Sequence, residues 1–254
     1  MSSQSEPLYN IEQSLKRLAD TGQVSVMPDY FMDRFVRVRT LDELTEAIKR
    51  KTAEGGGGSI RGINQSEVKG GNAVNLAFSL GKFGANVNLI AIADSLPART
   101  LLAIFEQMHN VNVDIVKGRA GFTVALEFLE AGKHVNVMVS DVGDLADFDG
   151  SSISDLSWKR IEASKFVCVV NWAANGKGSE LCERVFSRSK NNGARTFFDP
   201  ADLSGMAESI YKMKRMIFDK GLVDSMSINE NEARVVSGVL SNYVLPQDYS
   251  KAEL

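Results

Sequence analysis

Residues 70–94 have the sequence GGNAVNLAFSLGKFGANVNLIAIAD, and this stretch decides which fold the chain can adopt. Apolar side chains at i, i+3, i+4 and i+7 predict an amphipathic helix over 72–83. They are Ala73, Leu76, Ala77, Leu80 and Phe83. Gly84 predicts the end of that helix. The segment Val87–Ala93 that follows, apolar except for Asn88, predicts a strand buried on both faces.

The same alternation of strand and helix continues along the chain. Apolar or β-branched runs predict core strands at Gln23–Pro28, Val87–Ala93, Val111–Val116, Lys165–Val170, Ala194–Asp199 and Ser225–Ile228. Helical patterns lie at Leu41–Lys51, Asn72–Phe83, Pro97–His109, Lys177–Asn191, Leu203–Phe218 and Glu230–Ser237, with a further short helix predicted at Tyr9–Ala19. This order predicts one α/β domain over residues 1–254, built on a doubly wound, mostly parallel sheet flanked by helices.

A second kind of strand interrupts this order. Polar and apolar residues alternate over 34–40, 123–130 and 134–140, and Ala-Gly-Lys joins the last two as a short hairpin link. Strands of period two suit a sheet with one exposed face. We therefore expect a small antiparallel β lid, with strands at roughly 34–40, 59–69, 123–130 and 134–140.

Composition excludes several classes of partner. The chain has 254 residues, 29 Lys+Arg against 32 Asp+Glu, and a net charge of −3, which favours neither nucleic acid nor an anionic membrane. Its longest apolar runs have five residues, far short of the roughly 20 of a membrane span. With no apolar signal segment at the N-terminus, we expect a cytoplasmic protein. Cys168 and Cys182 lack metal-ligand spacing and are expected to be buried thiols.

Two glycine clusters could approach a ligand. Gly55–Gly58 precedes no helix and is interpreted as a flexible connector. Gly70 and Gly71 precede a helix whose first turn carries unpaired N–H groups and the amides of Asn72 and Asn75. Those amides supply donors and acceptors suited to a polyol. The alternative is a surface helix with Asn72 as its N-cap, and the residues alone leave both open.

Residues 70–94 resemble the first signature of the ribokinase (PfkB) family of carbohydrate and nucleoside kinases. The matching parts are Gly70, Gly71, Asn75, Ala77 and Gly84. The stretch VSVMPDYFMDRFVRV, residues 24–38, resembles the family's first strand, which implies that Asp33 holds substrate hydroxyls. Pro28 stands where the family usually has glycine.

The resemblance extends over roughly residues 22–240. MSINENEARVVSG, residues 226–238, is similar to the family's Asn-x-x-Glu element, which implies that Asn229 and Glu232 organise a metal and phosphates. Asp199, in FFDP, is expected on the same side. The period-two strands resemble the family's substrate lid, and because such lids often pair, a homodimer through the lid strands is expected.

The chain departs from the family pattern in three places. Its 254 residues contain no Gly-Ala-Gly-Asp, the signature that carries the catalytic base, so we expect the base beyond residue 254 and an incomplete sequence. A short protein unable to catalyse the reaction is the alternative. Ile-Ala-Asp-Ser, with Asp94, replaces Gly-x-Asp, and Ala201 and Asp202 follow the Asp-Pro pair in place of Asn-x-Arg.

The aspartate-rich segment 141–155 lacks calcium-loop spacing and is interpreted as a solvated link.

The resemblance implies ATP-dependent phosphoryl transfer to a hydroxyl of a sugar or sugar-like polyol, with ATP and Mg²⁺ as cofactors. The expected acceptor-binding residues are Asp33, Gly70, Gly71, Asn72 and Asn75, and the residues expected to organise phosphate and metal are Asn229, Glu232 and Asp199. Two alternatives are a nucleoside kinase of the same family and a non-catalytic sugar-binding homologue. A dinucleotide-dependent dehydrogenase is disfavoured because no G-x-G-x-x-G follows the first strand.

Overall fold

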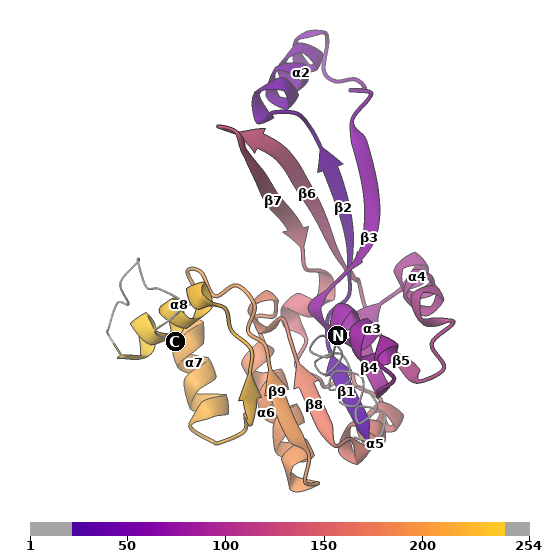
Figure 1. Ribbon diagram of the computed structural model, residues 1–254, viewed down its shortest axis with the longest axis vertical. Coiled ribbons are helices and arrows are strands. Elements are labelled where there is room, and N and C mark those ends of the chain that lie inside the picture. Colours follow the sequence, from indigo (N-terminus) through magenta and orange to yellow (C-terminus); the bar gives the residue numbers. More distant parts are fainter. Residues whose placement is uncertain (1–21, 242–254) are drawn as a thin grey trace, which may run out of the picture.

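The computed structural model describes residues 22–241, so the predicted helix Tyr9–Ala19 and both ends of the predicted domain 1–254 lie outside the described residues. The main body is a six-stranded sheet in the order β10-β9-β8-β1-β4-β5, with every pairing parallel (Figure 1). Its strands are β1 (Gln23–Met27), β4 (Asn86–Ala93), β5 (Val111–Lys117), β8 (Phe166–Val169), β9 (Arg195–Phe198) and β10 (Ser225–Met226).

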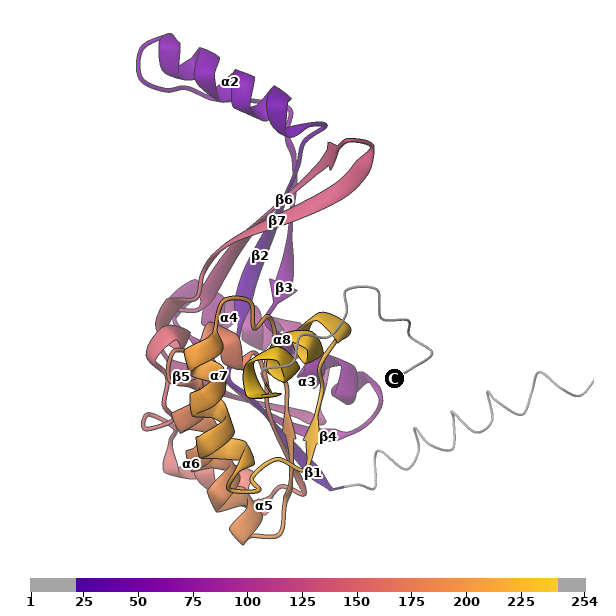
Figure 2. The ribbon, with the colours of Figure 1, turned by 90° about the vertical axis from the view of Figure 1, so that its left-hand side faces the viewer.

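Helices cover both faces of this sheet (Figure 2). One face carries α3 (Asn72–Lys82) and α4 (Ser95–Phe105). The other carries α5 (Asp155–Ala163), α6 (Gly178–Asn191) and α7 (Ala207–Met213, continued by a π turn at Lys214–Phe218), with α8 (Glu230–Ser241) against α7. Side chains alternate accordingly: Val24 and Val26 of β1 pack toward α3 and α4, and Met27 packs toward the opposite layer. The predicted doubly wound α/β fold is confirmed.

The lid is a separate four-stranded sheet that rises from the main body (Figure 1). Its strands are β2 (Phe31–Arg37), β3 (Asn64–Gly70), β6 (Gly121–Glu130) and β7 (Lys133–Asp141), in the order β3-β2-β6-β7. Two pairings are antiparallel, as expected, but β2 and β6 run parallel. The reason is that β2 continues from β1 and β6 from β5, and these two parallel strands of the main sheet leave it in the same direction.

Helix α2 (Leu41–Ala53) sits at the far end of the lid, between β2 and β3 (Figures 1 and 2). The hydroxyl of Thr40 caps it by accepting from the Glu43 N–H at 3.3 Å. Gly55–Gly58 lie in the exposed loop that follows, in agreement with their interpretation as a connector. The second lid strand, β3, begins at Asn64, five residues later than the predicted 59, because this loop extends through Ile63.

The connection from the lid back to the main sheet is more ordered than predicted. The aspartate-rich segment contains a 3-10 turn, η1 (Gly143–Asp147), and leads into α5, a helix that the sequence patterns missed. Ser154 caps α5 by accepting from the Ser157 N–H at 3.1 Å, and Trp158 and Ile161 are its buried apolar residues. Two apolar anchors in nine residues are too few for a clear helical period.

Over residues 22–241, no helix has the length and apolarity that crossing a membrane requires.

Gly71 holds the turn between the lid and α3, and its replacement tests that geometry. Its φ is +92°, and a Cβ there would lie 2.8 Å from the backbone oxygen of Asp29. We expect Gly71→Ala to lower the free energy of unfolding by about 3 kcal/mol, measured by urea denaturation. Gly193→Ala is the matched control, since its φ is +79° and the space around it is open, and it should cost only about 1 kcal/mol. Equal losses in the two variants would contradict the proposed backbone contact.

Candidate functional site

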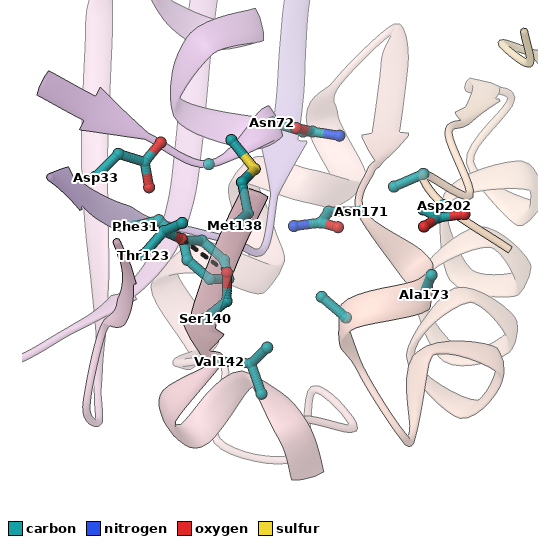
Figure 3. A pocket seen from close by; sticks show the side chains of 13 residues that line it. Phe31, Asp33, Asn72, Thr123, Met138, Ser140, Val142, Asn171, Ala173 and Asp202 are labelled. Carbon is teal, nitrogen blue, oxygen red and sulfur yellow. Dashed lines mark hydrogen bonds between the residues drawn. The ribbon is translucent and has the colours of Figure 1, made fainter. Parts of the chain in front are cut away.

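A cavity of about 390 Å³ lies between the lid and the carboxyl ends of the main-sheet strands. Figure 3 shows lid residues on one side and loops after β8 and β9 on the other. Its polar lining residues are Asp33, Asn72, Thr123, Ser140, Asn171 and Asp202, and the remainder are Phe31, Gly71, Met138, Val142, Ala173, Ala174 and Ala201. Ligands of open parallel sheets bind at this edge.

A buried carboxylate organises the floor of the cavity. Asp29 follows β1 and is fully buried. It accepts hydrogen bonds from the backbone N–H of Asn72 at 2.7 Å and of Ala73 at 2.9 Å, and from the side-chain amide of Asn171 at 2.9 Å. The first turn of α3 is therefore capped by a distant acidic residue rather than left open for a ligand.

This arrangement contradicts the alternative in which Asn72 is the N-cap of α3. The N-cap is Gly71, which has no side chain to offer, and Asn72 is the first helical residue. Because the Asn72 backbone donor already binds Asp29, only its side-chain amide remains available to the cavity that it lines. Sequence patterns missed Asp29 because capping motifs are local, whereas 43 positions separate Asp29 from Asn72.

Burial raises the pKa of Asp29 to about 6. The removal of the carboxylate from water is the dominant cause, and the hydrogen bonds from Asn171, Ala73 and Asn72 act in the opposite direction. At neutral pH the group is therefore ionised and can accept all three hydrogen bonds. Protonation in mildly acidic solution would convert one acceptor oxygen into a donor facing these N–H groups.

Asp33 lies on β2, where it is paired with Thr123 of β6 and Val68 of β3. Partial burial raises the pKa of Asp33, and a hydrogen bond from Thr123 lowers it. The Thr123 hydroxyl lies 3.0 Å from that of Ser140, so three polar side chains from adjacent strands meet at the cavity wall. Thr123 and Ser140 are outside the predicted site, because strand register cannot be read from period-two patterns.

Gly70 supports this wall through its lack of a side chain. A Cβ at position 70 would overlap the carboxylate of Asp33. Gly70 is therefore not a residue lining the cavity but the position that leaves room for Asp33. Gly71 lines the cavity directly.

Asn75 lies outside the cavity lining. Its side chain is exposed, and its amide oxygen accepts from the Lys69 ammonium at 3.0 Å. Nearly one helical turn separates Asn75 from Asn72 at the cavity end of α3. The structure thus brings together Asp33, Gly71 and Asn72 from the predicted acceptor site, and it does not bring Asn75 to them.

Asn229 and Glu232 form the N-terminal cap of α8. The Asn229 side-chain oxygen accepts from the Glu232 N–H at 2.9 Å, and Glu232 accepts from the Asn229 N–H at 3.0 Å and from its amide at 2.7 Å. This is a capping box. Asp199, at the end of β9, accepts from the Ala201 N–H at 2.9 Å. Within residues 22–241, no three His, Cys, Asp or Glu side chains come together in a way that could hold a metal ion.

No protein-family model matches the chain, and no curated protein matches it. Solved structures do. A ribokinase from Giardia lamblia is 16% identical with a TM-score of 0.66, over 92% of this chain and 63% of that one. A fructokinase from Xylella fastidiosa is 12% identical with a TM-score of 0.64, over 87% and 63%. Arabidopsis thaliana ribokinase, solved with ribose and ATP, is 15% identical with a TM-score of 0.60, over 86% and 63%.

These comparisons establish the ribokinase-like α/β fold of this chain. The chain spans about 63% of the length of each of these structures. At 12–16% identity the likeness is one of fold, and the residues of the cavity determine its chemistry.

The raised pKa of Asp29 predicts a specific dependence of stability on pH. Between the unfolded-state pKa near 3.9 and the folded-state value of about 6, the folded state holds the extra proton, so this group's stabilisation is lost as pH rises. We expect the free energy of unfolding of wild type, relative to Asp29→Asn, to fall by about 2 kcal/mol from pH 4 to pH 7. Urea denaturation at each pH measures this difference, in which the titrations of other carboxylates cancel. A difference independent of pH would show that Asp29 does not titrate in this window.

Proposed function

We propose that the chain binds a sugar or sugar-like polyol for ATP-dependent phosphoryl transfer to one of its hydroxyls, as a carbohydrate kinase of the PfkB type. The observation that carries this proposal is the meeting of Asp33, Gly71 and Asn72 in one cavity between the lid and the strand ends. A carboxylate accepts two hydroxyl hydrogen bonds, and a side-chain amide both donates and accepts. This combination suits vicinal hydroxyls, each of which can donate and accept.

The cavity walls suit the remainder of such a ligand. Phe31, Met138 and Val142 present apolar surface that can pack against the C–H faces of a sugar ring. Thr123 and Ser140 add hydroxyls beside Asp33. In this proposal the lid shields the acceptor from water, which would otherwise compete for the phosphoryl group.

ATP and Mg²⁺ are the cofactors of the proposed reaction. The neighbouring Arabidopsis ribokinase was solved with ribose and ATP. In this chain Asn229 and Glu232 bind each other and Asp199 binds a backbone N–H, so these three residues do not form a direct Mg²⁺ site. The proposed reaction therefore has neither its metal site nor its catalytic base among these three residues.

A ligand panel tests the proposal. Calorimetry with pentoses, hexoses, inositols and ribonucleosides should reveal at least one polyol that binds this chain, and a coupled assay for ADP release then tests whether the bound polyol is phosphorylated. Tighter binding of a ribonucleoside than of any sugar would support the nucleoside-kinase alternative. Binding of a polyol without ADP release would support a non-catalytic sugar-binding role. The absence of binding by every polyol would refute the proposal.

Asp33 is the residue whose loss should abolish acceptor binding. We expect Asp33→Ala to weaken binding of the polyol found in the panel by at least about 100-fold, because a charged acceptor of two hydroxyls is lost. Gly70→Ala should produce a similar loss by a different route, since the new Cβ displaces the Asp33 carboxylate. Both variants should retain the wild-type circular dichroism spectrum. Binding that survives both changes would contradict the role of Asp33.

We further propose that the protein pairs through its lids. The lid face opposite Asp33 carries Phe122 and Val124 of β6 and Val137 and Val139 of β7. These apolar side chains are 39–60% exposed, and Val124 and Val139 are paired across the strands. An exposed apolar patch of this kind is typical of an interface.

The dimer proposal predicts a change in mass. Wild type should sediment as a dimer at micromolar concentration, and Val124→Lys and Val139→Lys should sediment as monomers, because a lysine charge would be buried at the interface. Leu96→Lys is the matched control, since Leu96 is 61% exposed on α4, away from the lid. A wild-type protein that sediments as a monomer at these concentrations would refute the dimer proposal.

A further inference from the structure

The charges around the cavity have one sign. Asp33 stands on the lid side and Asp202 on the side of the β9 loop, across the cavity from each other (Figure 3). Of the described residues that line the cavity, none is Lys, Arg or His. Arg34, the residue next to Asp33, instead pairs with Glu67. A ligand in the cavity therefore meets two carboxylates and no cationic side chain from this lining.

The positive end of the α3 helix dipole at the cavity is already neutralised. The N-terminus of a helix attracts negative charge through its unpaired N–H groups, and α3 begins at the cavity. The backbone donors of Asn72 and Ala73, however, are bound by the buried carboxylate of Asp29. A phosphate or carboxylate of a ligand would have to compete with that internal anion.

Asp202 is held in place and charged. Its Oδ1 accepts from the Ser204 N–H at 3.0 Å and from the Ser204 hydroxyl at 2.6 Å. These bonds lower the pKa of Asp202, with the side-chain bond the larger cause. At neutral pH the group is an anion, and its second oxygen, Oδ2, accepts no hydrogen bond from the described residues.

We propose that the cavity selects its acceptor by charge, admitting neutral and amine-bearing polyols and rejecting those that carry a phosphate or carboxylate group. This inference rests on the proposed polyol site. Asp33 binds hydroxyls at the lid side, and Asp202 attracts an ammonium group, or repels an anion, at the opposite side. Since Asp202 is solvent-exposed, the preference is set by a screened interaction and is largest at low ionic strength.

Matched ligand series test the selection. Calorimetry on the full chain at low salt would compare glucose, glucosamine, glucuronate and glucose 6-phosphate, and in parallel ribose and ribose 5-phosphate. The amine form should bind about fivefold tighter than its parent, and the acid and phosphate forms at least about tenfold weaker. A phosphate or acid form that binds as tightly as its parent overturns the charge selection and leaves the proposed function intact. If no polyol binds, both fail together.

Two variants separate the local charge from the net charge of the protein. Asp202→Asn keeps an oxygen for the Ser204 N–H and removes the negative charge, and it should reduce the preference for amine over parent about threefold. Asp149→Asn is the matched control: Asp149 accepts from the Ser151 N–H at 2.8 Å in the same local turn and lies outside the cavity lining. The control should leave the preference unchanged. Equal effects of the two variants, or none from Asp202→Asn in a correctly folded protein, overturn the role of Asp202.

Discussion

The carboxylate of Asp29 is the contact on which the rest of the site depends. It joins the loop after β1, the first turn of α3 and the loop after β8, three segments that are far apart in the sequence. Burying a charge is costly unless hydrogen bonds compensate it, and here three donors do so. The contact fixes the N-terminus of α3 against the central strand of the sheet, and so places Gly71 and Asn72 at the cavity.

The lid supplies the other half of the site. Asp33, Thr123 and Ser140 reach the cavity from three adjacent strands, each at the register position that faces the main sheet. Because Gly70 has no side chain, the neighbouring Asp33 carboxylate has room beside it. The polar wall is therefore set by strand pairing, and the floor by helix capping.

The sequence was sufficient for the architecture because its signals are periodic and local. The buried runs such as Val87–Ala93 and the amphipathic pattern of α3 predict strand and helix within a few residues of the observed bounds. Two features could not be predicted in this way. Capping by Asp29 and the pairing of Asp33 with Thr123 join distant segments, and neither contact produces a periodic pattern in the sequence. Asn229 and Glu232 show that a local motif can be recognised correctly while its role stays open. Their side chains cap α8, and a helix cap needs this motif whether or not the residues also bind a ligand.

The parallel pairing of β2 with β6 also bears on the order of folding. Asp33 and Thr123 become neighbours although 90 positions separate them, and β7 completes the wall only at Asp141. Contacts of such long sequence separation form slowly, because a large loop must close before they gain any energy. The ligand cavity should thus be among the last regions to mature, and on the ribosome it would stay unformed until the chain has emerged past Asp202, which lines its far side.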